Sequence, residues 1–209
     1  MVVALASIWR LALVCIASVL ALSAYAGGGS RGSATDAAAA STLSAYPQAA
    51  PGLYTGGQPA PAEWPALAAA GVATVINLRA PEELQGRDEA AEVAAQGMRY
   101  LSMPVVGPDD VTDANAARLW QAIHEADGKV LVHCASGNRV GALLALAAYR
   151  NGGMDAPAAL AFGQSAGLTR LEPLVREHLD CRLASEDAVA DADMDATDSE
   201  TPAIPCVGN

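Results

Sequence analysis

Short apolar runs alternate with amphipathic stretches along the middle of the chain. Three of these runs have the length and β-branched composition of buried strands, and a shorter run precedes them. The expected strands are 53–55, 72–78, 100–105 and 130–133. Between and after them, apolar residues recur at helical spacing, and glycine or capping residues mark most of the ends. The expected helices are 61–70, 82–96, 112–127, 140–151, 156–166 and 170–180. Strands that alternate with helices predict an α/β fold with a mainly parallel sheet flanked by helices.

The same pattern divides the chain into four segments. The α/β pattern occupies one continuous stretch that is long enough for a single domain with its own core. The stretch before it is rich in Gly, Ser, Ala and Thr and is expected to form a flexible linker. The stretch after it is acidic, without a basic residue, and is expected to form a loosely attached tail. The expected segments are a signal peptide at 1–26, the linker at 27–50, the folded domain at 51–182 and the acidic tail at 183–209.

The first segment has the features of a secretory signal peptide. Arg10 precedes an apolar stretch at 11–22 that is too short for a comfortable membrane span, and the small residues Ala24 and Ala26 form a cleavage site. We therefore expect the protein to be exported, to the periplasm if the source is a Gram-negative bacterium, and to meet a membrane only through this segment. An uncleaved N-terminal anchor is the alternative.

The net charge argues against one class of binding partner, and the cysteine content indicates which thiols can form a disulfide. The formal net charge of −11 argues against a nucleic-acid partner. Removal of the signal peptide would leave Cys134, Cys181 and Cys206 in an oxidising compartment. A Cys181–Cys206 disulfide would close a loop of 24 intervening residues. A loop of that size contributes about 3 kcal/mol in the chain-entropy model. This pairing would leave Cys134 as the free thiol.

The most specific local feature is a turn of small polar residues between the last expected strand and the helix that follows. His133 ends the strand, Cys134 begins the turn, and Arg139 lies where the helix starts. Backbone N–H groups in such a turn converge, and the helix dipole there favours an anion or a thiolate. We therefore expect Cys134 to be a nucleophile, Arg139 a two-pronged anion clamp and His133 a support for the thiolate. The other residues of the expected anion-binding loop are Ala135, Ser136, Gly137 and Asn138.

Other strand ends should supply further groups, because ligands of open α/β sheets bind beyond the carboxyl ends of the strands. Arg79 is expected either to extend the anion site or to pair with Glu82 or Glu83. Asp109 and Asp110 lie on the loop after the second expected strand, where a general acid would stand, and Asp110 is slightly favoured. A Pro-Asp-Asp sequence before a helix is also typical of a turn or cap. The histidines and cysteines lack zinc-site spacing, so we expect no metal and no cofactor.

Four motifs together resemble the DUF442 family, whose members are called beta-lactamase-hydrolase-like, phosphatase-like or sulfur transferase domains. The motifs are Thr55-Gly56-Gly57-Gln58-Pro59, Ala69-Ala70-Gly71, Val75-Ile76-Asn77-Leu78-Arg79 and His133 to Gly141. The resemblance covers about residues 50–170. It implies the fold of the protein tyrosine and dual-specificity phosphatases, with an anion loop that holds Cys134 and Arg139.

The loop differs from that of tyrosine phosphatases in two respects. Four residues separate Cys134 from Arg139, where tyrosine phosphatases have five, and the shorter spacing is similar to the rhodanese sulfurtransferase loop. Val140 stands where phosphatases usually carry the Ser or Thr that helps the thiolate leave.

Three functions therefore stay open. They are a phosphatase-like hydrolase that forms a cysteinyl-phosphate, a sulfurtransferase that carries a persulfide on Cys134, and a non-catalytic anion-binding or redox module. The hydrolase is favoured, and the expected partner is a small anionic substrate, either a phosphoryl or a sulfane-sulfur donor.

Overall fold

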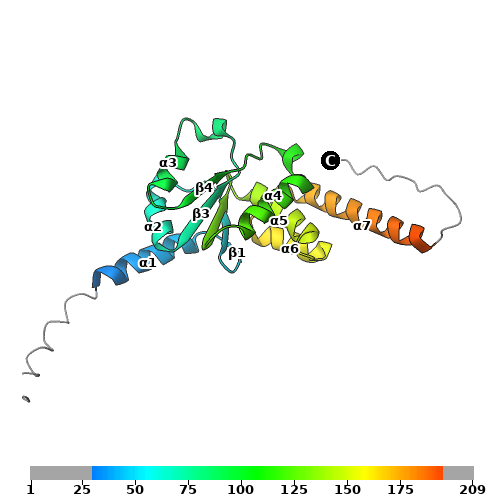
Figure 1. Cartoon of the computed structure of the whole chain (residues 1–209), viewed down its shortest axis with the longest axis horizontal. Helices are drawn as coiled ribbons and strands as arrows, with labels where there is room; N and C mark the ends of the chain where they lie inside the picture. The colour runs from blue at the N-terminus through cyan, green and yellow to red at the C-terminus, as the bar shows by residue number, and fades with distance from the viewer. Residues whose placement is uncertain (1–29, 195–209) are drawn as a thin grey trace, which may run out of the picture.

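Five strands form one sheet between two layers of helices (Figure 1). The computed structural model describes residues 30–194. The strands are β1 (Gln48–Ala50), β2 (Leu53–Gly56), β3 (Val72–Asn77), β4 (Arg99–Ser102) and β5 (Lys129–His133). The α-helices are α1 (Ser30–Ser44), α2 (Trp64–Ala69), α3 (Glu89–Ala94), α4 (Asp113–His124), α5 (Asn138–Arg150), α6 (Ala156–Ser165) and α7 (Glu172–Met194). Three short 3-10 turns are η1 (Pro61–Glu63), η2 (Pro81–Leu84) and η3 (Pro108–Asp110).

The sheet places the ends of its parallel strands side by side. Its order is β1-β2-β5-β3-β4, and every neighbouring pair is parallel except β1 with β2. In the register, Gly56 of β2 and Asn77 of β3 both lie beside His133 of the central strand β5. The mainly parallel sheet flanked by helices is thus confirmed, and the segment after His133 leaves the sheet at its middle.

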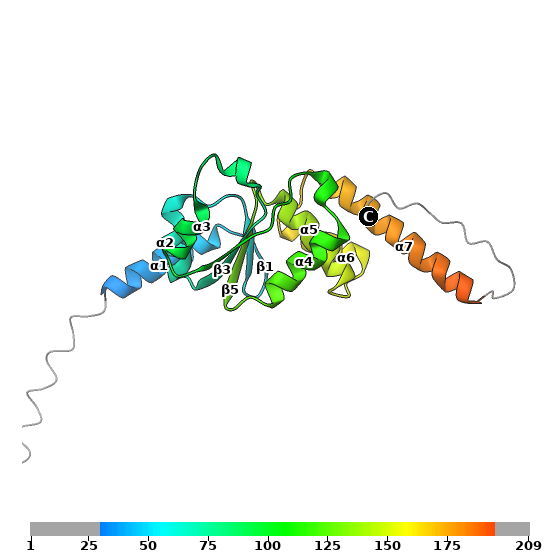
Figure 2. The ribbon, with the colours of Figure 1, turned by 45° about the horizontal axis from the view of Figure 1, so that its top comes forward.

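The two faces of the sheet pack against different helices. Helices α1, α2 and α3 cover one face, and α4, α5 and α6 cover the other (Figures 1 and 2). Along β5, Val130 and Val132 belong to the core under α4 and α5, whereas Leu131 belongs to the core under α1 and α2. Because successive side chains of a strand point to opposite faces, His133 continues the side of Leu131. Its ring centroid lies 6.4 Å from that of Trp64 on α2.

Helix α5 is the central helix of its layer, and all its residues from Val140 to Ala148 are buried. Its first turn touches α6 through glycines. A Cβ added to Gly141 would lie 2.6 Å from the carbonyl oxygen of Gly163 and 2.1 Å from the backbone nitrogen of Leu168. The lack of side chains therefore brings the backbone after α6 directly against the start of α5.

The prediction of a flexible linker at 27–50 is wrong for the part of that segment that the structure describes. Helix α1 and strand β1 occupy most of it, and Ala39, Leu43 and Tyr46 are buried. Alanine has the highest helix propensity, so an alanine-rich stretch needs few apolar anchors to form a packed helix. Small residues gave too weak an amphipathic pattern for the sequence to indicate this helix.

Two expected helices have different bounds. Helix α7 continues to Met194, beyond the expected start of the acidic tail at 183. The expected helix at 82–96 is divided into η2 and α3, because Gln85 and Gly86 between them adopt left-handed φ values of 53° and 82°. None of the described helices is long and apolar enough to cross a membrane. The expected signal peptide at 1–26 lies outside the described residues.

Candidate active site

The expected anion loop begins at the carboxyl end of β5. Cys134 is 1% exposed, and its N–H donates to the carbonyl oxygen of Gly56 (3.2 Å). Ala135 and Ser136 are exposed, and Gly137 precedes the first residue of α5. The N–H of Gly137 donates to the Sγ of Cys134 at 3.2 Å. A backbone donor at the N-terminus of a helix thus points at the Cys134 sulfur, in the arrangement that binds anions at helix N-termini.

Glycines allow three backbone segments to meet at this loop. Gly137 has a φ of 86°, a left-handed conformation that is strained for other residues. A Cβ there would lie 3.5 Å from the carbonyl carbon of Gly56, and Gly57 forms a β-bridge with Ser136. On the other side, a Cβ on Gly167 would lie 3.2 Å from the Gly137 carbonyl oxygen. The loop is thereby held between the end of β2 and the segment after α6.

Arg139 is fixed by a carboxylate and a carbonyl. Its Nη1 and Nη2 donate to the two carboxylate oxygens of Glu83 at 2.8 and 2.7 Å, and Nη1 also donates to the carbonyl of Val105 at 2.6 Å. The hydrogen bond to Glu83, with a smaller contribution from Cys134, raises the pKa of Arg139. The hydrogen bonds from Arg139 lower the pKa of Glu83 to about 2, although burial opposes this. Arg139 is therefore a permanent cation held close to Cys134.

Asn138, which we predicted to be an anion-binding residue, uses its side chain differently. Its Oδ1 accepts hydrogen bonds from the N–H and hydroxyl of Thr169 (2.8 and 3.1 Å) and from the N–H of Leu171 (3.3 Å). An amide oxygen so occupied fastens the segment after α6 to the start of α5. The sequence could not predict this tethering role of Asn138, because it depends on a contact with a segment about 30 positions away along the chain.

Arg79 pairs with neighbouring side chains, which was the alternative left open. Its guanidinium donates to the side-chain carbonyl of Gln58 and to the main-chain carbonyl of Glu83, and Nε lies 3.6 Å from the Glu83 carboxylate. Arg79 and Arg139 therefore share Glu83. Arg79 lies beside the site, but these contacts hold its guanidinium against the protein.

A buried pair behind the loop was not predicted. His133 and Glu89 are both 0% exposed, and His133 Nε2 lies 2.7 Å from Glu89 Oε1. The other carboxylate oxygen of Glu89 accepts from the amide of Gln58. Burial raises the pKa of Glu89, but its contacts with His133, Gln58 and Arg87 outweigh burial and the pKa falls below its ordinary value. Glutamate at the start of a helix is common on exposed surfaces, so the sequence held no signal that this one is buried.

The two aspartates of the expected acid loop differ in their surroundings. The carboxylate of Asp110 accepts the N–H of Val106 at 2.7 Å and so closes the turn at η3. Asp109 is exposed, and within the part of the chain described here its carboxylate accepts no hydrogen bond. Because Val105 binds Arg139 through its carbonyl, this loop begins beside the anion loop.

The cysteines and possible metal ligands complete the site. Cys134 is a free, buried thiol, and Cys181 on α7 is disulfide-bonded. Cys206, its expected partner, lies outside the described residues, so that pairing stays a prediction. No group of three or more His, Cys, Asp or Glu side chains within residues 30–194 is arranged to hold a metal ion.

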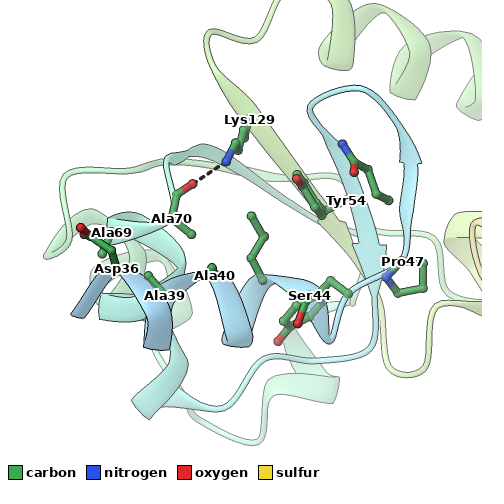
Figure 3. Close-up of a pocket in the computed structure, with 12 residues that line it drawn as sticks. Asp36, Ala39, Ala40, Ser44, Pro47, Tyr54, Ala69, Ala70 and Lys129 are labelled. Atoms are coloured by element: carbon green, nitrogen blue, oxygen red, sulfur yellow. Dashed lines mark hydrogen bonds between the residues drawn. The ribbon is translucent and has the colours of Figure 1, made fainter. Parts of the chain in front are cut away.

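A groove lies elsewhere, between α1, the end of α2 and residues of strands β1, β2 and β5. Its volume is about 680 Å³, and Asp36, Tyr54 and Lys129 are among its lining residues. Figure 3 shows Lys129 at its wall, where Nζ donates to the carbonyl of Ala70 at 2.7 Å. No residue of the anion loop lines this groove.

Comparison with known proteins points to one family. Residues 48–150 match the model of the phosphatase-like domain of beta-lactamase hydrolase-like proteins. A beta-lactamase hydrolase-like protein from Agrobacterium fabrum is 34% identical over 119 residues, which are 55% of this chain and 27% of that protein. One from Xylella fastidiosa is 35% identical over 119 residues, with the same coverage. The match thus spans only 27% of the length of these curated relatives.

Solved structures share the fold at low identity. A candidate DUF442 phosphatase from Shewanella putrefaciens CN-32 is 22% identical with a TM-score of 0.52, over 68% of this chain and 97% of that chain. A candidate phosphatase from Neisseria meningitidis Z2491 is 21% identical with a TM-score of 0.53, over 63% and 96% of the two chains. These matches confirm the phosphatase-like fold expected from the sequence.

Proposed function

Because residues 48–150 belong to the phosphatase-like domain family of beta-lactamase hydrolase-like proteins, we propose that this chain is a phosphatase-like hydrolase with Cys134 as its nucleophile. The observation that carries the proposal is the buried Cys134 thiol, which accepts the Gly137 N–H at 3.2 Å beside the fixed Arg139 guanidinium. A nucleophile, backbone donors and a cation at one place suit the attack on a dianionic ester.

The proposed reaction has two steps. The Cys134 thiolate attacks the phosphorus of a phosphomonoester, so that an S–P bond forms while the bond from phosphorus to the ester oxygen breaks. An aspartic acid gives its proton to the departing oxygen. Water then attacks the cysteinyl-phosphate and loses a proton to the same aspartate, which releases inorganic phosphate and restores the thiolate.

Asp109 is the better general acid of the two aspartates. The carboxylate of Asp110 is engaged with the Val106 N–H, a contact that holds the turn. Asp109 is exposed on the same turn and takes no part in that contact, so we assign it as the general acid. This reverses the slight preference for Asp110 drawn from the sequence.

Sulfur transfer is the second candidate, and the four-residue spacing with Val140 after the arginine favours it. In this reaction Cys134 attacks the outer sulfur of a donor such as thiosulfate, forming a persulfide and releasing sulfite. A thiol acceptor then takes the outer sulfur and returns Cys134 to the thiolate. This chemistry needs no general acid.

One set of assays separates the candidates. The reduced protein is tested for aryl phosphate turnover beside Cys134→Ser, Asp109→Asn and Asp110→Asn, and for a persulfide by intact mass after thiosulfate treatment. The proposal expects turnover that Cys134→Ser abolishes and that Asp109→Asn lowers by about 100-fold or more. Asp110→Asn should lower it much less. A persulfide without phosphate release would replace the hydrolase with the sulfurtransferase, and neither product would leave a binding or redox module.

We also propose that the protein is exported after cleavage of residues 1–26, with a small anionic substrate as its partner. Expression of the full chain in a Gram-negative host, followed by fractionation and N-terminal sequencing, should give a periplasmic product that starts at Gly27. Non-reducing peptide mapping of that product should link Cys181 to Cys206. A link to Cys15 would contradict both the cleavage and the pairing.

A further inference from the structure

The end of strand β2 holds the first residues of the anion loop in place. The carbonyl of Gly56, the last residue of β2, accepts the N–H of Cys134 at 3.2 Å. The next residue, Gly57, forms a β-bridge with Ser136. A displacement of Gly56 would therefore move the backbone of Cys134 and change the shape of the loop.

Gly56 is also in contact with the aromatic ring of Tyr46. A Cβ added to Gly56 would lie 2.7 Å from Cδ1 and 3.2 Å from Cε1 of that ring. Apart from the chain neighbours of Gly56, no atom of residues 30–194 outside the ring comes closer than 3.9 Å to this position. The φ of Gly56 is not in the left-handed region. Position 56 therefore lacks a side chain because the Tyr46 ring fills that space.

Tyr46 is fixed both through its backbone and at the tip of its ring. Its N–H donates to the carbonyl of Leu43 at 3.1 Å, and its hydroxyl donates to the carboxylate of Glu63 at 3.2 Å. Burial, with a smaller contribution from Glu63, raises the pKa of Tyr46, so the hydroxyl stays a donor at neutral pH. Tyr46 is 9% exposed and belongs to the same core as Leu43 and Trp64. The ring therefore has little freedom to turn away from Gly56.

The segment that carries Tyr46 is joined to β2 at the adjacent position as well. Tyr46 lies between α1 and β1, before residue 48, where the match to the family model begins. The N–H of Thr55 donates to the carbonyl of Pro47 at 2.9 Å. The chain that leads from α1 into β1 thus holds β2 by a backbone hydrogen bond at Thr55 and by a ring at Gly56.

We propose that Tyr46 is a positioning residue for the anion loop, because its ring fixes Gly56 and Gly56 in turn fixes the backbone of Cys134. The proposal rests on the proposed function, in which this loop binds the phosphoryl group that Cys134 attacks. Without the ring, the end of β2 would relax into the vacated space, and the hydrogen bond from Cys134 to Gly56 would lengthen. Misplacement of a reacting atom by about 1 Å can lower the rate about 100-fold. A contact outside the site can therefore decide how well the site works.

The test measures binding of inorganic phosphate to the reduced protein, followed through the amide NMR signals of Ala135 and Ser136. Tyr46→Ala removes the ring, and Tyr46→Phe keeps the ring without its hydroxyl. Gly56→Ala places a methyl group against the ring. Leu43→Ala is the matched control, because Leu43 is buried in the same core and is not among the atoms nearest to Gly56.

The variants should separate a positioning role from a merely structural one. Tyr46→Ala and Gly56→Ala should each weaken phosphate binding by about tenfold, because each disturbs the hydrogen bond that holds the loop. Tyr46→Phe should bind phosphate as the unmodified protein does. Leu43→Ala should lower the Tm and leave the affinity unchanged. In the double variant, Gly56→Ala should weaken binding no further than Tyr46→Ala alone, because its methyl group then meets no ring.

Two results would overturn the proposal. The first is a phosphate affinity of Tyr46→Ala equal to that of Leu43→Ala, which would mean that the ring contributes only to stability. The second is a loss of affinity in the double variant that equals the sum of the two single losses in free energy, which would mean that the ring and Gly56 act independently.

Hydrogen exchange covers the case in which Tyr46→Ala does not fold. Gly56→Ala, with the ring in place, should speed exchange at the Cys134 amide relative to the Val132 amide of the same strand, because the Cys134 N–H is pulled from its acceptor. Unchanged relative protection would overturn the proposal. The proposed function fails separately. Absence of both phosphate binding and aryl phosphate turnover in the unmodified protein would reject the hydrolase, and faster exchange at Cys134 in Gly56→Ala would keep the role of Tyr46.

Discussion

Replacement of Gly141 by alanine tests whether the anion loop depends on backbone contact between α5 and the segment after α6. The new Cβ would lie 2.1 Å from the nitrogen of Leu168 and 2.6 Å from the oxygen of Gly163. Both are main-chain atoms, which cannot rotate away as a flexible side chain can. Ordinary van der Waals contact begins near 3.4 Å, so the backbone at Leu168 would have to retreat by more than an ångström.

The cost follows from this displacement. Overpacking of a well-packed core costs typically about 1–3 kcal/mol. Because Gly141→Ala makes two backbone clashes at buried positions, we expect it to lower the free energy of unfolding by an amount at the upper end of that range, about 3 kcal/mol. For a protein of this size that corresponds to a fall in Tm of roughly 6–12 °C. Because Leu168 precedes Thr169, which binds Asn138, the displacement should also reduce aryl phosphate turnover.

The assay is thermal unfolding followed by circular dichroism, with Gly107→Ala as the matched control. Gly107 has a φ of −145°, and a Cβ there would have no atom within 4 Å, so alanine should be tolerated. Equal Tm values for Gly141→Ala and Gly107→Ala would refute the reasoning, since they would mean that α6 can move away from α5 at no cost.

Three further changes test other contacts. Glu83→Gln should lower the free energy of unfolding at neutral pH by about 1–3 kcal/mol, because it removes the carboxylate paired with Arg139. Since the pKa of Glu83 is lowered from 4.5 to about 2, this stabilisation is complete above 4.5 and is lost as pH falls through about 2. Urea unfolding at several pH values should show that the free energies of unfolding of Glu83→Gln and the unmodified protein converge as the pH falls from 4.5 to about 2. A gap between the two free energies that persists at the lowest pH would contradict this prediction. Asn138→Ala should lower the free energy of unfolding by about 2 kcal/mol. It should also speed hydrogen exchange at the amides of Thr169 and Leu171, because both lose their acceptor. Unchanged protection of these amides would argue against the tether. Thr112→Ala should lower the free energy of unfolding by about 1 kcal/mol, because the Thr112 hydroxyl caps α4 by accepting the Asn115 N–H at 3.2 Å. The substitution should leave turnover unchanged. An unaltered Tm would show that the cap does not contribute to stability.

The sheet and the position of the loop could be predicted because both depend on local patterns. Apolar runs with β-branched residues gave the strands, and the rule that parallel strands end at one edge brought His133 beside Asn77. Helix α1 could not be predicted in the same way. Its burial rests on Ala39 and Leu43, and only the presence of α2 and the sheet opposite them makes these small or isolated residues part of a core.

The hydrogen-bond partners of the site residues could not be predicted from local sequence patterns either. Glu89 and Glu83 lie in the first turns of short helices, where acidic residues usually face solvent. Only the fold shows that one meets His133 and the other Arg139, because the residues of each pair lie 44 and 56 positions apart. Polar residues of this kind acquire their roles from tertiary contacts that no periodicity records.

The glycine contacts on both sides of the anion loop bear on how relatives of this protein could diversify. Gly137 and Gly167 have φ values of 86° and 107°, which strain any residue with a side chain, so adding atoms there is an unfavourable way to reshape the cradle. The surfaces free to vary are its margins, where Val106 is 67% exposed and Arg170 also faces solvent. Under the proposed function, the reactive centre and the surface that selects the anion thus lie on different parts of the chain. Randomising the margin should yield proteins that choose different anions while they keep the same reactive centre.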